Sequence, residues 1–121
     1  MKTREQLRAE RASSMVATLK ADVVRDYTCE VRAFPATVHQ AGLAPALATL
    51  KAKGGPARNH LYDHVSAWVS ETSFSEPKGD ALALIIKSPA VHLLRAQEEA
   101  LAFAAWLRRF AEAREPKARK A

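Results

Sequence analysis

The last part of the chain carries one long apolar stripe at helical spacing. Between Pro89 and about Arg114, apolar side chains follow one another at steps of three and four residues: Leu93, Ala96, Ala100, Phe103, Leu107 and Phe110. This spacing places them on one face of an α-helix. Leu101 and Trp106 widen the stripe, so the helix has to pack against several other elements. We therefore expect the earlier segments to build the groove that holds this helix, with Trp106 and Phe110 in the core.

The composition favours a helical protein. Of the 121 residues, 48% are hydrophobic and 26% are charged, which is the balance of a folded domain. Ala, Leu, Arg, Glu and Lys dominate, and β-branched residues are sparse, which favours helix over sheet. We predict an all-α, single-domain bundle of five or six helices over residues 1–114, with long first and last helices. A basic flexible tail over residues 115–121 is expected to follow.

A second apolar stripe runs through the N-terminal part of the chain. Its members also step by three or four: Ala12, Val16, Leu19, Val23, Tyr27, Val31 and Phe34. They predict one long helix over residues 3–33, begun by a capping box of Thr3 and Gln6. Because Pro35 disfavours helical geometry at the residue before it, this helix should stop or kink there. Two short helices, 35–41 and 44–53, would then meet near Gly42.

The middle of the chain predicts two further helices. Residues 57–73 carry an amphipathic pattern, after a linker made by Lys53-Gly54-Gly55-Pro56. A second loop covers residues 73–78. The apolar run 81–86 that follows fits a buried helix or a strand. We favour a helix over 80–87 because the chain offers no second strand for it to pair with.

The charge balance points to an anionic partner. Nineteen Lys and Arg residues against thirteen Asp and Glu residues give a net charge of +6, which suits nucleic acid, although a basic soluble surface accounts for it equally well. Cys29 is the only cysteine, which excludes an intrachain disulfide and a cysteine-rich zinc site. With no apolar run of membrane-spanning length and no apolar signal core at the start, we expect a cytoplasmic protein.

No catalytic motif stands out. His60 and His64 are four residues apart and could bind zinc from one helix face, but no third ligand is evident, so a helix surface with two histidines is favoured. Glu98 and Glu99 are adjacent and therefore point to different faces. The chain contains no phosphate loop, dinucleotide fingerprint or Gly-x-Ser-x-Gly motif. We expect no enzyme activity, no metal and no cofactor.

The basic residues form three groups along the chain. They comprise Arg4, Arg8 and Arg11 on one face of the first helix, Lys51, Lys53 and Arg58 around the Gly-Gly-Pro linker, and Arg108 and Arg109, with Arg114, near the end of the last helix. Glu5 and Glu10 are expected to lie away from the first group. These cations could line a groove for backbone phosphates, or they could be a solvated surface. Aromatic residues do not alternate with them, which argues against base stacking.

Two blocks of sequence resemble a known family. One is residues 34–53, a Pro-led helix, a Gly-Leu junction and a second short helix that ends in lysine; the other is residues 98–113, with Glu-Ala-Leu and then Trp-Leu-Arg-Arg-Phe-Ala-Glu-Ala. Together with the length and the order of helices, they resemble the small helical subunit of the type III-B CRISPR effector, the Cmr complex.

The resemblance implies an all-α bundle without catalytic activity. Its copies would stack into a short inner filament along ribonuclease-type subunits, and a basic channel would hold crRNA paired with target RNA. The implied partners are other Cmr-complex subunits, copies of the chain itself, crRNA and target RNA, with no membrane and no small-molecule substrate. A DNA-binding regulator of helix-turn-helix type is the alternative, supported by the Gly42 junction alone.

Overall fold

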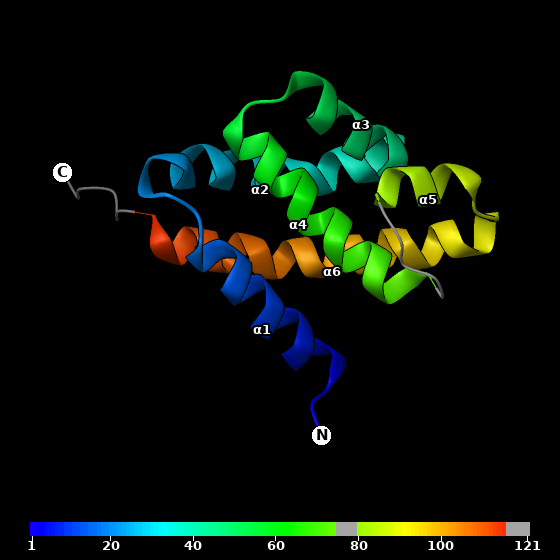
Figure 1. Ribbon diagram of the computed structural model, residues 1–121, viewed down its shortest axis with the longest axis horizontal. Helices are drawn as coiled ribbons and strands as arrows, with labels where there is room; N and C mark the ends of the chain where they lie inside the picture. The colour runs from blue at the N-terminus through cyan, green and yellow to red at the C-terminus, as the bar shows by residue number, and fades with distance from the viewer. Residues whose placement is uncertain (75–79, 116–121) are drawn as a thin grey trace.

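The computed structural model describes residues 1–74 and 80–115 and contains only helices over these ranges (Figure 1). The helices are α1 (Arg4–Ala17), α2 (Ala21–Ala41), α3 (Leu43–Lys53), α4 (Pro56–Ser73), α5 (Ala81–Lys87) and α6 (Ala90–Arg114). The predicted all-α fold is confirmed, and so is the helix at 80–87. No described helix has the length and apolar character needed to cross a membrane.

Helix α6 lies at the centre of the packing. It contacts α1, α2 and α4 most extensively, and Figure 1 shows α1 and α2 on opposite sides of it, with α4 crossing it. Its buried residues are mainly alanines, together with Phe103 and Leu107. Small side chains let the neighbouring helices approach closely. The groove that the apolar stripe predicted is therefore built by these three helices.

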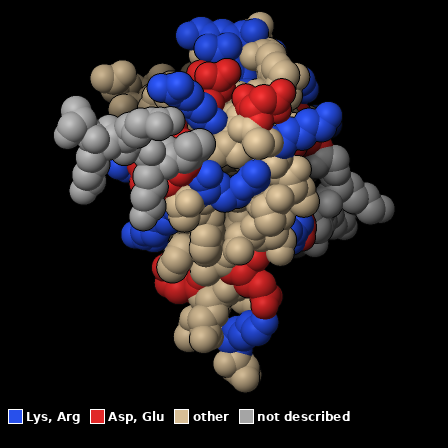
Figure 2. Space-filling view, turned by 90° about the vertical axis from the view of Figure 1, so that its left-hand side faces the viewer, with Lys and Arg blue, Asp and Glu red and all other residues tan. Residues whose placement is uncertain are grey.

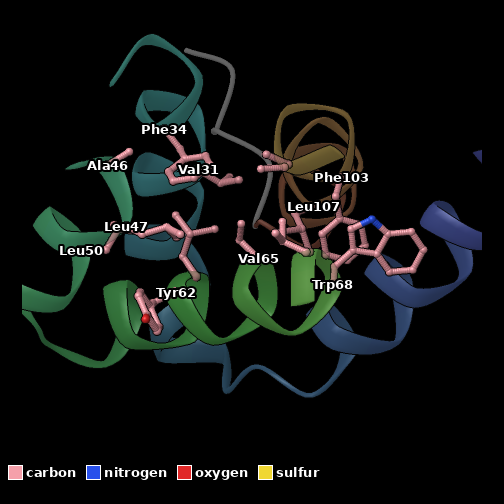
Figure 3. Packing of buried hydrophobic residues seen from close by; sticks show 14 of the residues in the cluster. Val31, Phe34, Ala46, Leu47, Leu50, Tyr62, Val65, Trp68, Phe103 and Leu107 are labelled. Atoms are coloured by element: carbon pink, nitrogen blue, oxygen red, sulfur yellow. The ribbon is translucent and has the colours of Figure 1, made fainter. Parts of the chain in front are cut away.

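The core continues from α6 into α3 (Figure 3). Phe103 of α6 stacks on Trp68 of α4, with ring centroids 4.7 Å apart and planes 7° from parallel. Val31 and Phe34 of α2 extend this cluster towards Leu47 of α3. These side chains are all buried, so aromatic stacking and aliphatic packing act in one continuous cluster.

The predicted long first helix is two helices. The capping box of Thr3 and Gln6 is present, but α1 ends at Ala17 and α2 begins at Ala21. No glycine or proline marks this break. Arg114, at the end of α6, donates from Nη1 to the carbonyl oxygens of Val16 and Leu19, each at 2.7 Å. The chain turns here because α6 supplies this partner, a contact that local periodicity cannot reveal.

Pro35 does not end α2, contrary to the prediction. The helix passes through it and ends at Gly42, whose N–H donates to the Val38 carbonyl oxygen at 2.8 Å. A proline inside a helix removes one backbone hydrogen bond. The buried face of α2 continues on both sides of Pro35, from Phe34 to Val38, and this burial outweighs the loss. The predicted helix at 35–41 is therefore the end of α2, whereas Gly42, with φ +97°, is the predicted junction.

Three further predictions have different outcomes. Gly54 and Gly55 both have positive φ and form the predicted linker between α3 and α4. Trp106 and Phe110 are only partly buried, so their placement in the core was wrong. The predicted loop at 73–78 and the tail at 115–121 lie largely outside the described residues, apart from Ser73, Phe74 and Glu115.

The packing distinguishes two aromatic residues of α6. We expect Phe103→Ala to lower the free energy of unfolding by about 3–5 kcal/mol, because it removes a fully buried ring and leaves a cavity beside Trp68. Trp106→Ala should cost clearly less, because its ring is already partly in water. Urea unfolding with an unchanged m-value measures both. Equal losses would contradict this assignment of the core.

Candidate nucleic-acid and subunit interface

The structure brings part of the α6 basic group close to α1. Trp106 of α6 donates from Nε1 to Glu5 of α1 at 2.9 Å, and the Arg109 guanidinium lies 4.7 Å from the centre of the Trp106 ring. Arg109 of α6 therefore lies close to α1, whereas the neighbouring Arg108 shares Glu112 with Arg32 of α2. The loop between α3 and α4, which carries the third group, lies on the opposite side of the bundle (Figure 1). The three basic groups therefore do not line a single groove.

Two of the α1 cations are used inside the chain. Arg8 donates to Glu99 from Nε at 2.7 Å and from Nη2 at 2.9 Å, and to Glu5 from Nη1 at 2.6 Å. Arg11 holds both carboxylate oxygens of Glu71, at 3.0 and 2.5 Å. The expectation that Glu5 lies away from this face was wrong. Paired in this way, Arg8 and Arg11 offer little charge to an external anion.

Glu99 is the anionic centre of the α1–α6 contact. It is 9% exposed, and it also accepts a hydrogen bond from Trp68 Nε1 at 2.7 Å. Burial by itself would raise the pKa of Glu99, but the hydrogen bonds from Arg8 and Trp68 outweigh burial and hold this pKa below its usual value. Sequence reasoning missed this role. The signal was present, because Glu99 falls at helical spacing within the stripe that Ala96 and Phe103 define.

The outward cations of the α1 and α6 groups are Arg4, Arg108 and Arg109. Arg4 is 54% exposed, and its guanidinium lies 3.9 Å from Glu99. Arg108 is 52% exposed and reaches Glu112 of the same helix at 3.2 Å. Arg108 and Arg109 also line a shallow depression beside Pro35, between α2 and α6. An anion seated there would meet two guanidinium groups, which bind carboxylates and phosphates through paired hydrogen bonds, but it would compete for Arg108 with Glu112, which also lines the depression.

The third basic group is partly neutralised. Arg58 lies 3.2 Å from Glu30 and lines a pocket with it, while Lys51 lies 3.8 Å from Asp80 and 5.2 Å from the centre of the Tyr62 ring. Lys53 is exposed at the end of α3 and has no ion pair among the described residues. Lys51 remains 61% exposed, so the two lysines are the available charges of this group.

Charges of both signs are mixed on one face of the molecule (Figure 2). On the face shown in Figure 2, Lys and Arg side chains lie between Asp and Glu side chains. A surface of this kind binds a polyanion weakly, because each phosphate contact competes with a nearby carboxylate. Any contact with nucleic acid is therefore expected from small clusters such as Arg108 and Arg109.

The two histidines of α4 have different environments. His60 is exposed, but His64 is only 8% exposed, and its Nδ1 lies 2.8 Å from the buried Tyr27 hydroxyl oxygen. The interpretation of both as surface histidines was wrong for His64. Among the described residues, no group of three His, Cys, Asp or Glu side chains is arranged to hold a metal ion. Contact with Tyr27 gives His64 a packing role between α2 and α4.

Comparison with known proteins identifies a family whose match covers the same residues as the helices. The sequence profile described as "CRISPR-associated protein (Cas_Cmr5)" matches residues 4–114, from the first residue of α1 to the last of α6. The chain belongs to the Cmr5 family. The resemblance of residues 34–53 and 98–113 to the small subunit of the type III-B Cmr complex is thereby confirmed. Gly42 is then the α2–α3 junction of a Cmr5 fold rather than a sign of a DNA-binding helix-turn-helix.

A solved structure agrees with the family assignment. The chain is similar to a CRISPR-associated Cmr5 family protein from Thermus thermophilus, with a TM-score of 0.72 and 26% sequence identity. The similarity covers 93% of this chain and 97% of that one, so the two proteins share the whole bundle. A search of curated proteins found no match.

The buried ion pair predicts a measurable coupling. In a double-mutant cycle of Arg8→Met and Glu99→Gln, we expect a coupling energy on the order of 1–3 kcal/mol, because each single change takes the main ionic partner from a largely desolvated charge. The matched control is Arg11→Met with Glu71→Gln, a more exposed pair that should couple by about 0–1 kcal/mol. Urea unfolding gives both values. A control coupling as large as that of Arg8 and Glu99 would contradict the role of burial.

His64 predicts a loss of stability in mild acid. Burial, and secondarily the nearby His60, lowers the pKa of His64 to about 4, below the 6.5 of an unperturbed histidine. The unfolded chain therefore takes up a proton between pH 6.5 and 4 that the folded chain does not. The free energy of unfolding should fall over this window by an amount on the order of 2–3 kcal/mol.

Denaturant unfolding at several pH values measures this loss. His64→Gln should flatten the profile between pH 6.5 and 4.5. His60→Gln, which changes an exposed histidine, should flatten it much less, because His60 is only the secondary cause of the lowered pKa of His64. The Glu99 carboxylate has a lowered pKa, so its contribution disappears only as the pH falls below about 4.5. A profile that stays steep in His64→Gln would assign the acid sensitivity elsewhere.

Proposed function

We propose that this Cmr5-family chain is a non-catalytic structural subunit of the type III-B ribonucleoprotein effector in antiviral defence, acting in the cytoplasm. Its copies stack into an inner filament with other Cmr subunits, and its outward cations help hold crRNA and target RNA. The observation that carries this proposal is the family match over residues 4–114, which includes every described helix.

The distribution of charge favours an auxiliary rather than a dominant role in RNA binding. Arg8, Arg11 and Arg58 are engaged with carboxylates of the chain and are the less exposed of the candidate basic residues. Arg4, Lys51 and Arg108 also lie near carboxylates but stay more than half exposed, so they are the outward candidates together with the exposed Lys53 and Arg109. Of these, Arg108 and Arg109 are adjacent and line one depression. Because their guanidinium groups would contact backbone phosphates, binding should be independent of RNA sequence and sensitive to salt.

The two buried groups with shifted pKa values, Glu99 and His64, support a structural role for the chain. Glu99 is held by Arg8 and Trp68, and His64 is packed against Tyr27. Perturbed pKa values can mark a catalytic site, but they also arise in structural ion-pair networks. Here the contacts of both groups join one helix to another, so packing accounts for each shift.

Binding of labelled single-stranded RNA tests the phosphate contacts. We expect Arg108→Gln with Arg109→Gln to weaken binding and to reduce the slope of log K against log salt by about 1.4, which corresponds to two phosphate contacts on a single strand. Lys51→Gln with Lys53→Gln tests the loop in the same way. The matched control is Lys87→Gln with Arg95→Gln, which removes the same charge from exposed positions elsewhere.

These measurements distinguish a localised phosphate-binding site from a general effect of positive charge on RNA binding. A control that weakens binding as much as the Arg108 and Arg109 change would reject a localised contact. Assembly is tested separately, by co-purification of tagged chain from its native cell. Recovery of crRNA and large Cmr subunits supports the proposal, and recovery of the chain without them contradicts it.

A further inference from the structure

The turn between α1 and α2 is unusual because its own sequence does not demand it. Residues 18–20, Thr-Leu-Lys, contain no glycine or proline, and Leu and Lys are good helix formers. The apolar stripe also passes through the turn without a change of period, from Val16 through Leu19 to Val23. By local sequence alone, α1 and α2 would form one continuous helix.

A contact from another part of the chain stabilises the turn. In a continuous helix, the Val16 carbonyl would accept from the N–H of residue 20, and the Leu19 carbonyl from that of residue 23. Here Arg114 donates to both acceptors, the N–H of Leu19 also donates to the Val16 carbonyl oxygen at 3.1 Å, and the N–H of Val23 donates to the Lys20 carbonyl oxygen at 2.9 Å. The bent form is therefore stabilised by hydrogen bonds from the end of α6 in addition to those of the turn itself.

Helix α1 is attached to the bundle mainly through α6. Ala12 and Val16 are its buried residues, and Arg8 joins it to Glu99 of α6. Figure 1 shows α1 leaving the bundle on the side of α6 opposite to α2, with its first residues furthest out. An arm that packs on one neighbour, joined to the rest by a short turn, has the geometry of an element that two copies can exchange.

We propose that two copies of this chain exchange α1. Residues 18–20 become helical, α1 and α2 form one continuous helix, and each α1 packs on α6 of the other copy. The contacts of Ala12, Val16 and Arg8 are then remade between chains, so the two forms differ mainly at the turn. Protein concentration sets the balance between them. This exchange is independent of the proposed RNA contacts and of any stacking of unexchanged copies.

Two substitutions move the balance in opposite directions. Lys20 has φ −68° and donates no backbone hydrogen bond within the described residues, so Lys20→Pro fits the bent form and disrupts the continuous helix. Arg114→Ala removes the two hydrogen bonds that only the bent form uses. Arg95→Ala is the matched control, because Arg95 is an exposed arginine of the same helix that, in the part of the chain the structure describes, makes no hydrogen bond to the turn; it also lies outside the proposed RNA contacts.

Light scattering after size-exclusion chromatography measures the dimer fraction over a range of concentrations. We expect a dimer in the wild-type chain that increases in Arg114→Ala, decreases at least several-fold in Lys20→Pro and is unchanged in Arg95→Ala. Circular dichroism checks that each variant is folded. A monomer at every concentration in both the wild type and Arg114→Ala would overturn the proposal, as would a dimer that Lys20→Pro leaves intact.

A distance within one chain separates exchange from stacking. In a Cys29→Ser background, spin labels at Ser13→Cys and Ala36→Cys, both exposed positions, are measured after dilution into unlabelled protein. In the exchanged dimer the two positions lie on one helix, 23 residues and about 35 Å apart. Stacked, unexchanged copies keep the distance of the monomer. A dimer fraction with the monomer distance would therefore overturn exchange while leaving the proposed stacking intact.

Discussion

Burial of α6 by three neighbouring helices is the constraint on which the rest of this structure depends. The helix is lined by alanines and carries Phe103 and Leu107 into the core, so α1, α2 and α4 can all approach it closely. A polar group on such a helix has to be satisfied inside the contact. Glu99 meets this requirement by accepting hydrogen bonds from Arg8 on α1 and Trp68 on α4, and one carboxylate thus ties three helices together.

The same packing divides the basic residues into two classes. Arg8, Arg11 and Arg114 serve the fold, the first two through carboxylates and the third through the carbonyl oxygens of the α1–α2 turn. The cations that point outward, such as Arg108 and Arg109, are what a basic Cmr5-family subunit has to offer a polyanion. A net charge of +6 therefore overstates the charge available to RNA, because a cation paired at close range within the chain attracts an external phosphate weakly.

Sequence reasoning succeeded where periodicity and local geometry were sufficient. The apolar steps of α6 predicted a helix in contact with several others, and Gly42 marked a helix end because its positive φ is costly for other residues. It failed at Pro35, where the burial of one α2 face outweighs a lost hydrogen bond. For the candidate interface it named the basic residues, but it could not tell which of them face outward, because their partners are up to 91 residues away.

By itself, the sequence determined the helical class and a last helix that packs against several others, because these follow from spacing and composition. It indicated the family only through the resemblance of residues 34–53 and 98–113. Only the tertiary structure decided that Glu99 is a buried anion, that Trp106 is only partly buried and that α1 and α2 are separate helices. The turn shows the reason most directly. Residues 16–23 are compatible with a continuous helix, and the choice against it is made by the guanidinium of Arg114, which folding alone brings to the Val16 and Leu19 carbonyls.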